Sequence, residues 1–112
     1  MKSTLLSNLQ KDRTKITTEE LISKFPDGVT VNQFDFATVK DKVFAVVTFA
    51  EDDTLYYNGG IVLTKMCLSW AAGFNGDPES ASVALMKSGG VKMKFTETKT
   101  KGGNNVITIT VV

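Results

Sequence analysis

Histidine is absent from this chain of 112 residues, which contains one cysteine and one arginine. Without histidine the chain lacks the usual general base near neutral pH, so histidine-based triads and metal sites are excluded. The single cysteine, Cys67, excludes an intramolecular disulfide. Because its neighbours are apolar, we expect its thiol to be an inert part of the core. These absences predict a protein that is not an enzyme and binds no cofactor or metal.

Long apolar runs are also missing. No segment approaches the roughly 20 apolar residues that span a bilayer, and residues 1–10 contain no run long enough for a signal peptide. We therefore expect a cytoplasmic protein without membrane contact. The composition is ordinary for a globular chain, and its length predicts one domain over residues 1–112. Residues 17–112 are expected to form the core, preceded by a mobile arm, 1–16, in which Leu5, Leu6 and Leu9 have helical spacing.

The net charge of only +1 argues against a protein whose whole surface is basic. Charge is nevertheless segregated along the sequence. Residues 87–101 contain only one acidic residue, Glu97, and five lysines: Lys87, Lys92, Lys94, Lys99 and Lys101. Any electrostatic function must therefore depend on this local excess.

The C-terminal residues predict a β-hairpin with a cationic face. Apolar residues at 91, 93 and 95 alternate with Lys92, Lys94 and Thr96, which is the period of a strand. A Gly-Gly-Asn-Asn turn signal follows, and a second alternating run then occupies residues 107–111. We interpret this hairpin as the binding site of a polyanion. The alternative is that its lysines only protect an edge strand from aggregation.

Three strands and three helices are predicted before the hairpin. Thr17 and Glu20 have the spacing of a capping box, so a short helix begins there and ends before Pro26. Strands follow at 29–39, 43–50 and 54–57, and helices are expected at 61–72 and from Asp77 and Pro78 onward. The apolar positions of the first strand change phase at Asn32 and Gln33, which predicts a β-bulge.

Three strands, a helical insertion and two further strands have the connectivity of an OB-fold. We therefore predict a mainly β, α+β protein: a five-stranded OB-like barrel with helices between strands three and four and a short N-terminal helix. The alternatives are a small α+β sandwich or an incomplete barrel that needs a partner.

Aromatic residues on the first three strands supply surfaces on which bases can stack. Phe44 is one candidate for an outward-facing ring. Tyr56 and Tyr57 must point to opposite faces of their strand, and we expect Tyr57 to be the exposed one. Trp70 is expected to close the bottom of the barrel.

Two further motifs have structural interpretations that we favour over ligand binding. Glu51, Asp52 and Asp53 are more typical of a solvated turn than of a cation site. Gly59 and Gly60 precede a helix without a phosphate-binding fingerprint, so they indicate a strand-to-helix turn.

Several segments together resemble small single-stranded-DNA-binding-like proteins of phages and mobile elements of Gram-positive bacteria. The similarity covers roughly residues 17–112 and depends on five segments: 49–52, 55–60, the apolar helix with Trp70, 90–95 and 99–103. The resemblance implies an OB-fold, a setting in replication or recombination, and contact with single-stranded DNA through the second and third strands and the last hairpin.

The leading hypothesis is a non-enzymatic module that binds single-stranded DNA with little sequence preference. The residues expected to contact DNA are Lys92, Lys94, Lys99, Lys101, Lys40, Lys42, Tyr57 and Phe44. The alternative is a protein-interaction or assembly module of a phage or prophage, in which a strand edge or the N-terminal arm binds a partner. Its partners would be a second copy of the chain or phage or host replication proteins.

Overall fold

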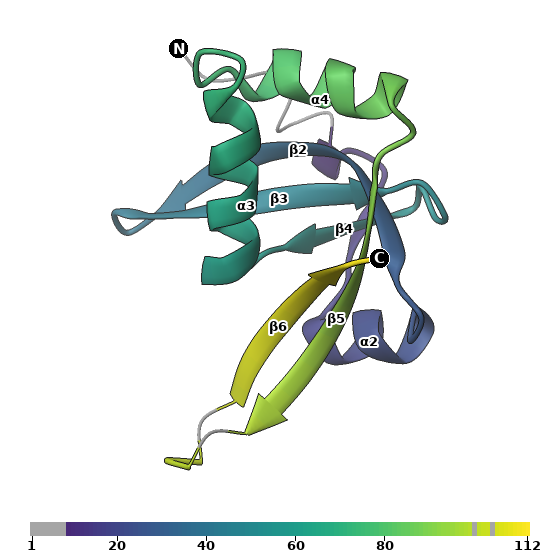
Figure 1. Cartoon of the computed structure of the whole chain (residues 1–112), viewed down its shortest axis with the longest axis vertical. Coiled ribbons are helices and arrows are strands. Elements are labelled where there is room, and N and C mark those ends of the chain that lie inside the picture. Colours follow the sequence, from purple (N-terminus) through teal and green to yellow (C-terminus); the bar gives the residue numbers. More distant parts are fainter. Residues whose placement is uncertain (1–8, 100, 104) are drawn as a thin grey trace.

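The computed structural model describes residues 9–99, 101–103 and 105–112 and has a mixed α+β architecture (Figure 1). In chain order its elements are β1 (Thr14–Lys15), α2 (Thr18–Lys24), β2 (Val29–Val39), β3 (Lys42–Phe49), β4 (Leu55–Asn58), α3 (Ile61–Ala72), α4 (Pro78–Lys87), β5 (Val91–Lys99) and β6 (Asn105–Val111). The strands form one six-stranded sheet in the order β1-β4-β3-β2-β5-β6.

Local sequence signals explain where several elements begin. The Thr17 hydroxyl accepts a hydrogen bond from the Glu20 N–H, and the Glu20 carboxylate accepts one from the Thr17 N–H, so the predicted capping box is confirmed. Asp77 caps α4, with Pro78 in its first turn, as predicted. The register of β2 against β3 shifts between Val31 and Gln33, which confirms the predicted bulge.

The core lies between the sheet and helices α2, α3 and α4. Its fully buried members include Val29, Val31, Phe34, Val47, Phe49, Leu63, Cys67 and Met93. The ring of Trp70 lies 5.7 Å from that of Phe34, between ring centroids. Trp70 therefore packs on the face of the sheet, whereas the sequence interpretation placed it at the bottom of a barrel.

The sheet differs from the predicted barrel in two respects. It is open, since β1 and β6 lie at opposite ends of the strand order, and it contains a sixth strand, β1, which runs parallel to β4. β1 is too short and too polar to produce an alternating pattern, so the sequence could not reveal it. Leu9 and Ile16, which belong to the arm predicted at 1–16, are buried. Leu5 and Leu6 lie outside the described residues.

Two buried hydroxyl groups cover edges of the central β2–β3 hairpin. β2 pairs with β5 only over Val29–Val31; farther along, the Ser82 hydroxyl of α4 donates to the Phe34 carbonyl (2.8 Å) and accepts from the Phe34 N–H (3.0 Å). On the other side, the Thr64 hydroxyl of α3 accepts from the Ala45 N–H (3.0 Å). The helices thus satisfy backbone groups that neighbouring strands leave unpaired.

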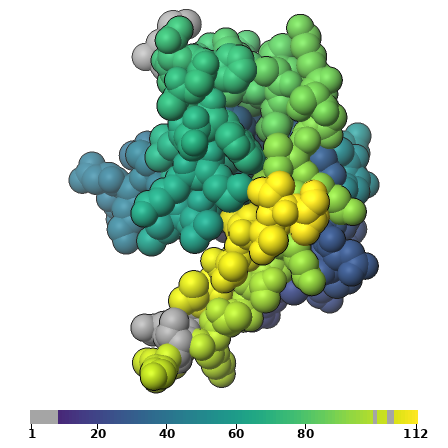
Figure 2. Space-filling model, viewed as in Figure 1, coloured from purple at the N-terminus to yellow at the C-terminus, as the bar shows by residue number. Residues whose placement is uncertain are grey.

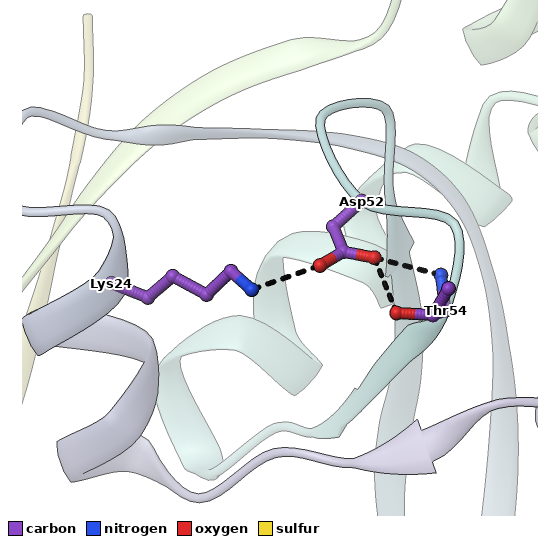
Figure 3. A network of polar contacts seen from close by, with 3 residues as sticks. All are labelled: Lys24, Asp52 and Thr54. Carbon is purple, nitrogen blue, oxygen red and sulfur yellow. Dashed lines mark hydrogen bonds and ion pairs between the residues drawn. The ribbon is translucent and has the colours of Figure 1, made fainter.

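A polar network joins α2 to the turn between β3 and β4 (Figure 3). The Lys24 ammonium lies 3.0 Å from the Asp52 carboxylate, which also accepts hydrogen bonds from the hydroxyl and N–H of Thr54. The hydrogen bonds from Thr54 and Lys24 lower the pKa of Asp52 from 3.8 to about 2. The ionised form of Asp52 is therefore favoured in the folded protein.

This network predicts a pH-dependent contribution to stability. Because the pKa of Asp52 is depressed on folding, its contribution is complete above about pH 4 and is lost as the pH falls toward about 2. We expect Asp52→Asn to lower the Tm at neutral pH. The difference in Tm between the variant and the wild type should shrink as the pH falls from about 4 to about 2. Thermal denaturation followed by circular dichroism measures both. A Tm difference that is constant down to pH 2 would contradict the role of the carboxylate.

Cys67 is fully buried in α3, and burial raises the pKa of its thiol to about 12. Because the thiolate is the reactive form, the folded protein should resist alkylation by iodoacetamide at about pH 8. The same thiol should react readily in urea. Mass spectrometry distinguishes the two cases, and rapid alkylation of the native protein would disprove the burial of Cys67.

Candidate nucleic-acid interface

The β5–β6 hairpin projects from the body of the protein as a two-stranded ribbon (Figures 1 and 2). Its antiparallel register pairs Lys94 with Thr110, Thr96 with Thr108 and Phe95 with Ile109. Since paired residues share a face and neighbours alternate, the ribbon has two chemically distinct faces. Phe95 and Ile109 lie on the face that packs toward the core.

The other face is polar and cationic, and we call it the lysine–threonine face. Val106 lies on this face opposite Thr98, and the six polar members of the face are Lys92, Lys94, Thr96 and Thr98 of β5 with Thr108 and Thr110 of β6. All six side chains are exposed. Glu97 lies on the opposite face, so the ribbon places no carboxylate within this set. Two ammonium groups and four hydroxyls therefore share one surface, and both kinds of group bind phosphate oxygens.

The root of this face is positioned by Gly28 and by the start of β2. Lys92 pairs with Thr30, and both the N–H and the hydroxyl of Thr30 donate to the Glu51 carboxylate, each at 2.8 Å. Gly28 has φ +118°, and a Cβ there would lie 3.2 Å from the Met93 carbonyl and 3.4 Å from Lys92 Cε. Glycine thus permits the close approach of this turn to β5.

Acidic residues border the lysine–threonine face. Glu51 is held beside it by Thr30, and Glu19 of α2 and Glu97 of β5 line a hollow of about 390 Å³ together with Lys94 and Thr96. These carboxylates limit the extent of the positive charge around Lys92 and Lys94, which agrees with the near-neutral charge of the chain.

The hairpin separates the four lysines that were predicted to act together. Lys99 is an odd-numbered residue of β5 and lies on the face opposite Lys92 and Lys94, beside Glu97. Lys101 is exposed in the turn. Residues 100 and 104, which belong to the connection between β5 and β6, lie outside the described residues.

A second group of cations surrounds the turn between β2 and β3. Lys40 and Asp41 both have positive φ (49° and 66°), as a two-residue hairpin turn requires. Lys42 and Phe44 are two residues apart and share a face of β3, and they line a hollow of about 340 Å³ with Lys65 of α3. Lys65 was missed by the sequence analysis, because α3 was interpreted only as a core helix.

The prediction that Tyr57 is exposed is wrong. Its side chain is 4% exposed, its hydroxyl shares a 2.7 Å hydrogen bond with that of Thr18, and its ring packs edge-on against Phe95. Tyr57 therefore offers no free surface for a base. Tyr56, on the opposite face of β4, and Phe44 are partly exposed.

Neither the acidic turn nor the glycine pair forms an evident ligand site. The carboxylates of Glu51 and Asp52 are hydrogen-bonded to Thr30 and Thr54, and the Gly59 N–H donates to the Ala45 carbonyl at 2.7 Å. Over residues 9–99, 101–103 and 105–112, no three potential metal ligands from His, Cys, Asp or Glu come together. In the same ranges, every helix is too short or too polar to cross a membrane.

Comparisons with known proteins found no match: no family model, no curated protein and no solved structure resembles the chain detectably. Function must therefore be inferred from the geometry and chemistry of the chain itself.

Proposed function

We propose that the protein is a non-enzymatic module that binds single-stranded nucleic acid, and DNA in particular, with little sequence preference. The observation that supports this most is the lysine–threonine face, where two lysines and four threonines are exposed on a projecting ribbon without a carboxylate among them. Together with the resemblance described above, it favours a role in replication or recombination of a phage or mobile element, in the cytoplasm.

The fold is consistent with an open variant of an OB-like barrel. Helices α3 and α4 separate β4 from β5, as an OB-fold requires. Tyr57 of β4 and Ile107 and Ile109 of β6 line the same groove of about 510 Å³. In this interpretation the groove is the unclosed seam of the barrel.

The chemistry of the face favours contact with the backbone of a nucleic acid. Lysines neutralise phosphates, and threonine hydroxyls donate to phosphate and sugar oxygens, so neither kind of contact distinguishes one base from another. Lys101 at the hairpin turn extends the surface that contacts the nucleic acid. Lys99 lies on the opposite face and reaches the nucleic-acid strand only around the edge of the ribbon. Lys42 and Lys65 line a separate hollow with Phe44, the aromatic ring best placed to stack with a base, and Lys40 lies in the adjoining turn.

Titration of fluorescent oligo-dT at about 50 mM and about 200 mM salt tests this proposal. Each contact between a lysine and a phosphate of a single strand contributes about −0.7 to the slope of log affinity against log salt. Two contacts therefore predict a loss of about 7-fold over this range, and four contacts a loss of about 50-fold. Absence of binding at the lower salt concentration would refute the proposal.

A protein-interaction function is the second candidate, and the free edge of β6 favours it. This alternative predicts association with a protein strand that persists at high salt, because backbone hydrogen bonds and apolar contacts are screened less than contacts between exposed charges.

A further inference from the structure

β6 has a free hydrogen-bonding edge along its length. The Val112 N–H donates to the Lys92 carbonyl of β5 at 3.0 Å. Because the backbone groups of successive strand residues point in alternate directions, those of Thr108 and Thr110 also face β5. The N–H and C=O groups of Ile107, Ile109 and Val111 therefore point away from it. Among the described strands none pairs with that side of β6.

Several other edges of the sheet are short, charged or covered. The side of β5 that faces away from β6 pairs with no described strand beyond Met93, and that stretch carries Lys94, Glu97 and Lys99. β1, at the opposite end, is only two residues long and contains Lys15. The Ser82 hydroxyl covers the exposed edge of β2, and the Thr64 hydroxyl covers that of β3. Short edge strands, charged residues and covering helices are the usual defences against pairing with another chain.

β6 lacks these defences. Its sequence, Asn-Val-Ile-Thr-Ile-Thr-Val, contains no charge and no proline, and it is rich in β-branched residues. Val106 is 41% exposed, and Val111 and Val112 are each 60% exposed. In Figure 2 β6 (yellow) lies at the surface, and no other segment crosses it in that view. A strand of this composition at an open edge is a template for strand addition.

We infer that the partner is a second copy of this chain, joined through antiparallel pairing of the two β6 strands about Ile109. The residues whose backbone groups point away from β5, Ile107, Ile109 and Val111, are spaced symmetrically about Ile109. Ile109 would face Ile109 of the second copy, and Ile107 would face Val111, so that each pair exchanges both of its hydrogen bonds. An uncharged strand brings no like charges together across such a two-fold axis, which suits isologous association.

The apolar groove beside β6 provides space for the added strand. Its volume is about 510 Å³, and Ile61 and Val62 of the first turn of α3 line it together with Ile107 and Ile109 of β6. Ile61 is 76% exposed and Val62 42% exposed. Pairing would bring apolar side chains of the second β6 toward these residues and bury part of their exposed apolar surface.

The two ribbons would then form one continuous sheet. Its polar face would contain Lys92 and Lys94 from both copies, which doubles the lysines available to one nucleic-acid strand. This consequence depends on the proposed function, whereas the association itself does not. Failure to bind oligo-dT would therefore leave the inferred dimer standing, and a strictly monomeric protein would leave DNA binding standing.

Sedimentation equilibrium of the full chain over a concentration series, without nucleic acid, tests the inference. We expect a monomer–dimer equilibrium that persists from about 0.1 M to about 1 M NaCl, although the Debye length falls from about 10 Å to about 3 Å. Val111→Pro removes one outward N–H and leaves the Val112 bond to β5 in place, and Val111→Lys adds a charge at the edge. Each should weaken dimerisation at least about tenfold.

Thr96→Lys adds the same charge to the inner strand of the ribbon and serves as the matched control, with dimerisation unchanged. Hydrogen exchange distinguishes the residues involved: the amides of Ile107 and Ile109 should exchange more slowly as concentration rises, whereas those of Thr108 and Thr110 should not change. A monomer at every soluble concentration would overturn the inference. Variants at Val111 that fold and dimerise like wild type would overturn it too.

Discussion

Replacing Lys92 and Lys94 together by alanine is expected to lower the affinity for oligo-dT at least about tenfold at low salt and to reduce the salt slope by about 1.4. Both side chains are exposed on the lysine–threonine face, so their removal should leave the fold intact. The effect should be nearly independent of the base sequence, because the contacts are to phosphates. Fluorescence anisotropy at several salt concentrations measures the affinity and the slope.

The matched control removes two other exposed lysines, Lys11 and Lys15, from the opposite end of the sheet. Equal losses in both double variants would indicate that only total charge matters, and the interface would then be wrongly assigned. A Lys40→Ala, Lys42→Ala double variant measures the second cationic group. A larger loss in that variant would place the interface at the β2–β3 turn instead.

Ser82→Ala is expected to lower the free energy of unfolding by about 2–4 kcal/mol, because the hydroxyl serves two buried backbone groups that would each lose their partner. Ser82 is 2% exposed, and it both donates to and accepts from Phe34. Water cannot replace it easily at a site packed between α4 and β2. Urea denaturation followed by circular dichroism gives the free energy of unfolding.

Ser80→Ala provides the control within the same helix. Both substitutions gain the same helix propensity, but the Ser80 hydroxyl is exposed and bonds only to the Asp77 carboxylate at 2.6 Å. We expect Ser80→Ala to cost about 1 kcal/mol or less. If Ser82→Ala is no more destabilising than Ser80→Ala, the hydroxyl does not protect the edge of β2 in the way described.

Elements with local signals could be predicted from the sequence, and elements specified by distant contacts could not. The cap formed by Thr17 and Glu20 and the bulge at Asn32 depend on neighbouring residues, and both were found where predicted. β1 depends on hydrogen bonds that the N–H groups of Thr14 and Ile16 donate to the carbonyls of Thr54 and Tyr56, and nothing in its own sequence indicates a strand.

The candidate site was predicted only in part, for two different reasons. Successive residues of a strand face opposite sides, so the sequence alone already implies that Lys99 faces away from Lys94. The sequence could not show which of Tyr56 and Tyr57 is buried, because this depends on the register of β4 against β3 and on the hydroxyl of Thr18 in α2. Lys65 approaches Lys42 only through the packing of α3 beside β3.

Mapping backbone amide shifts by NMR during titration with oligo-dT at low salt tests the proposed interface most directly. The largest changes should occur at Lys92, Lys94 and Thr96 of β5 and at Thr108 and Thr110 of β6, and they should diminish as salt is added. Absence of any shift at low salt, or shifts confined to residues away from the β5–β6 ribbon, would contradict the assignment of this face to nucleic acid.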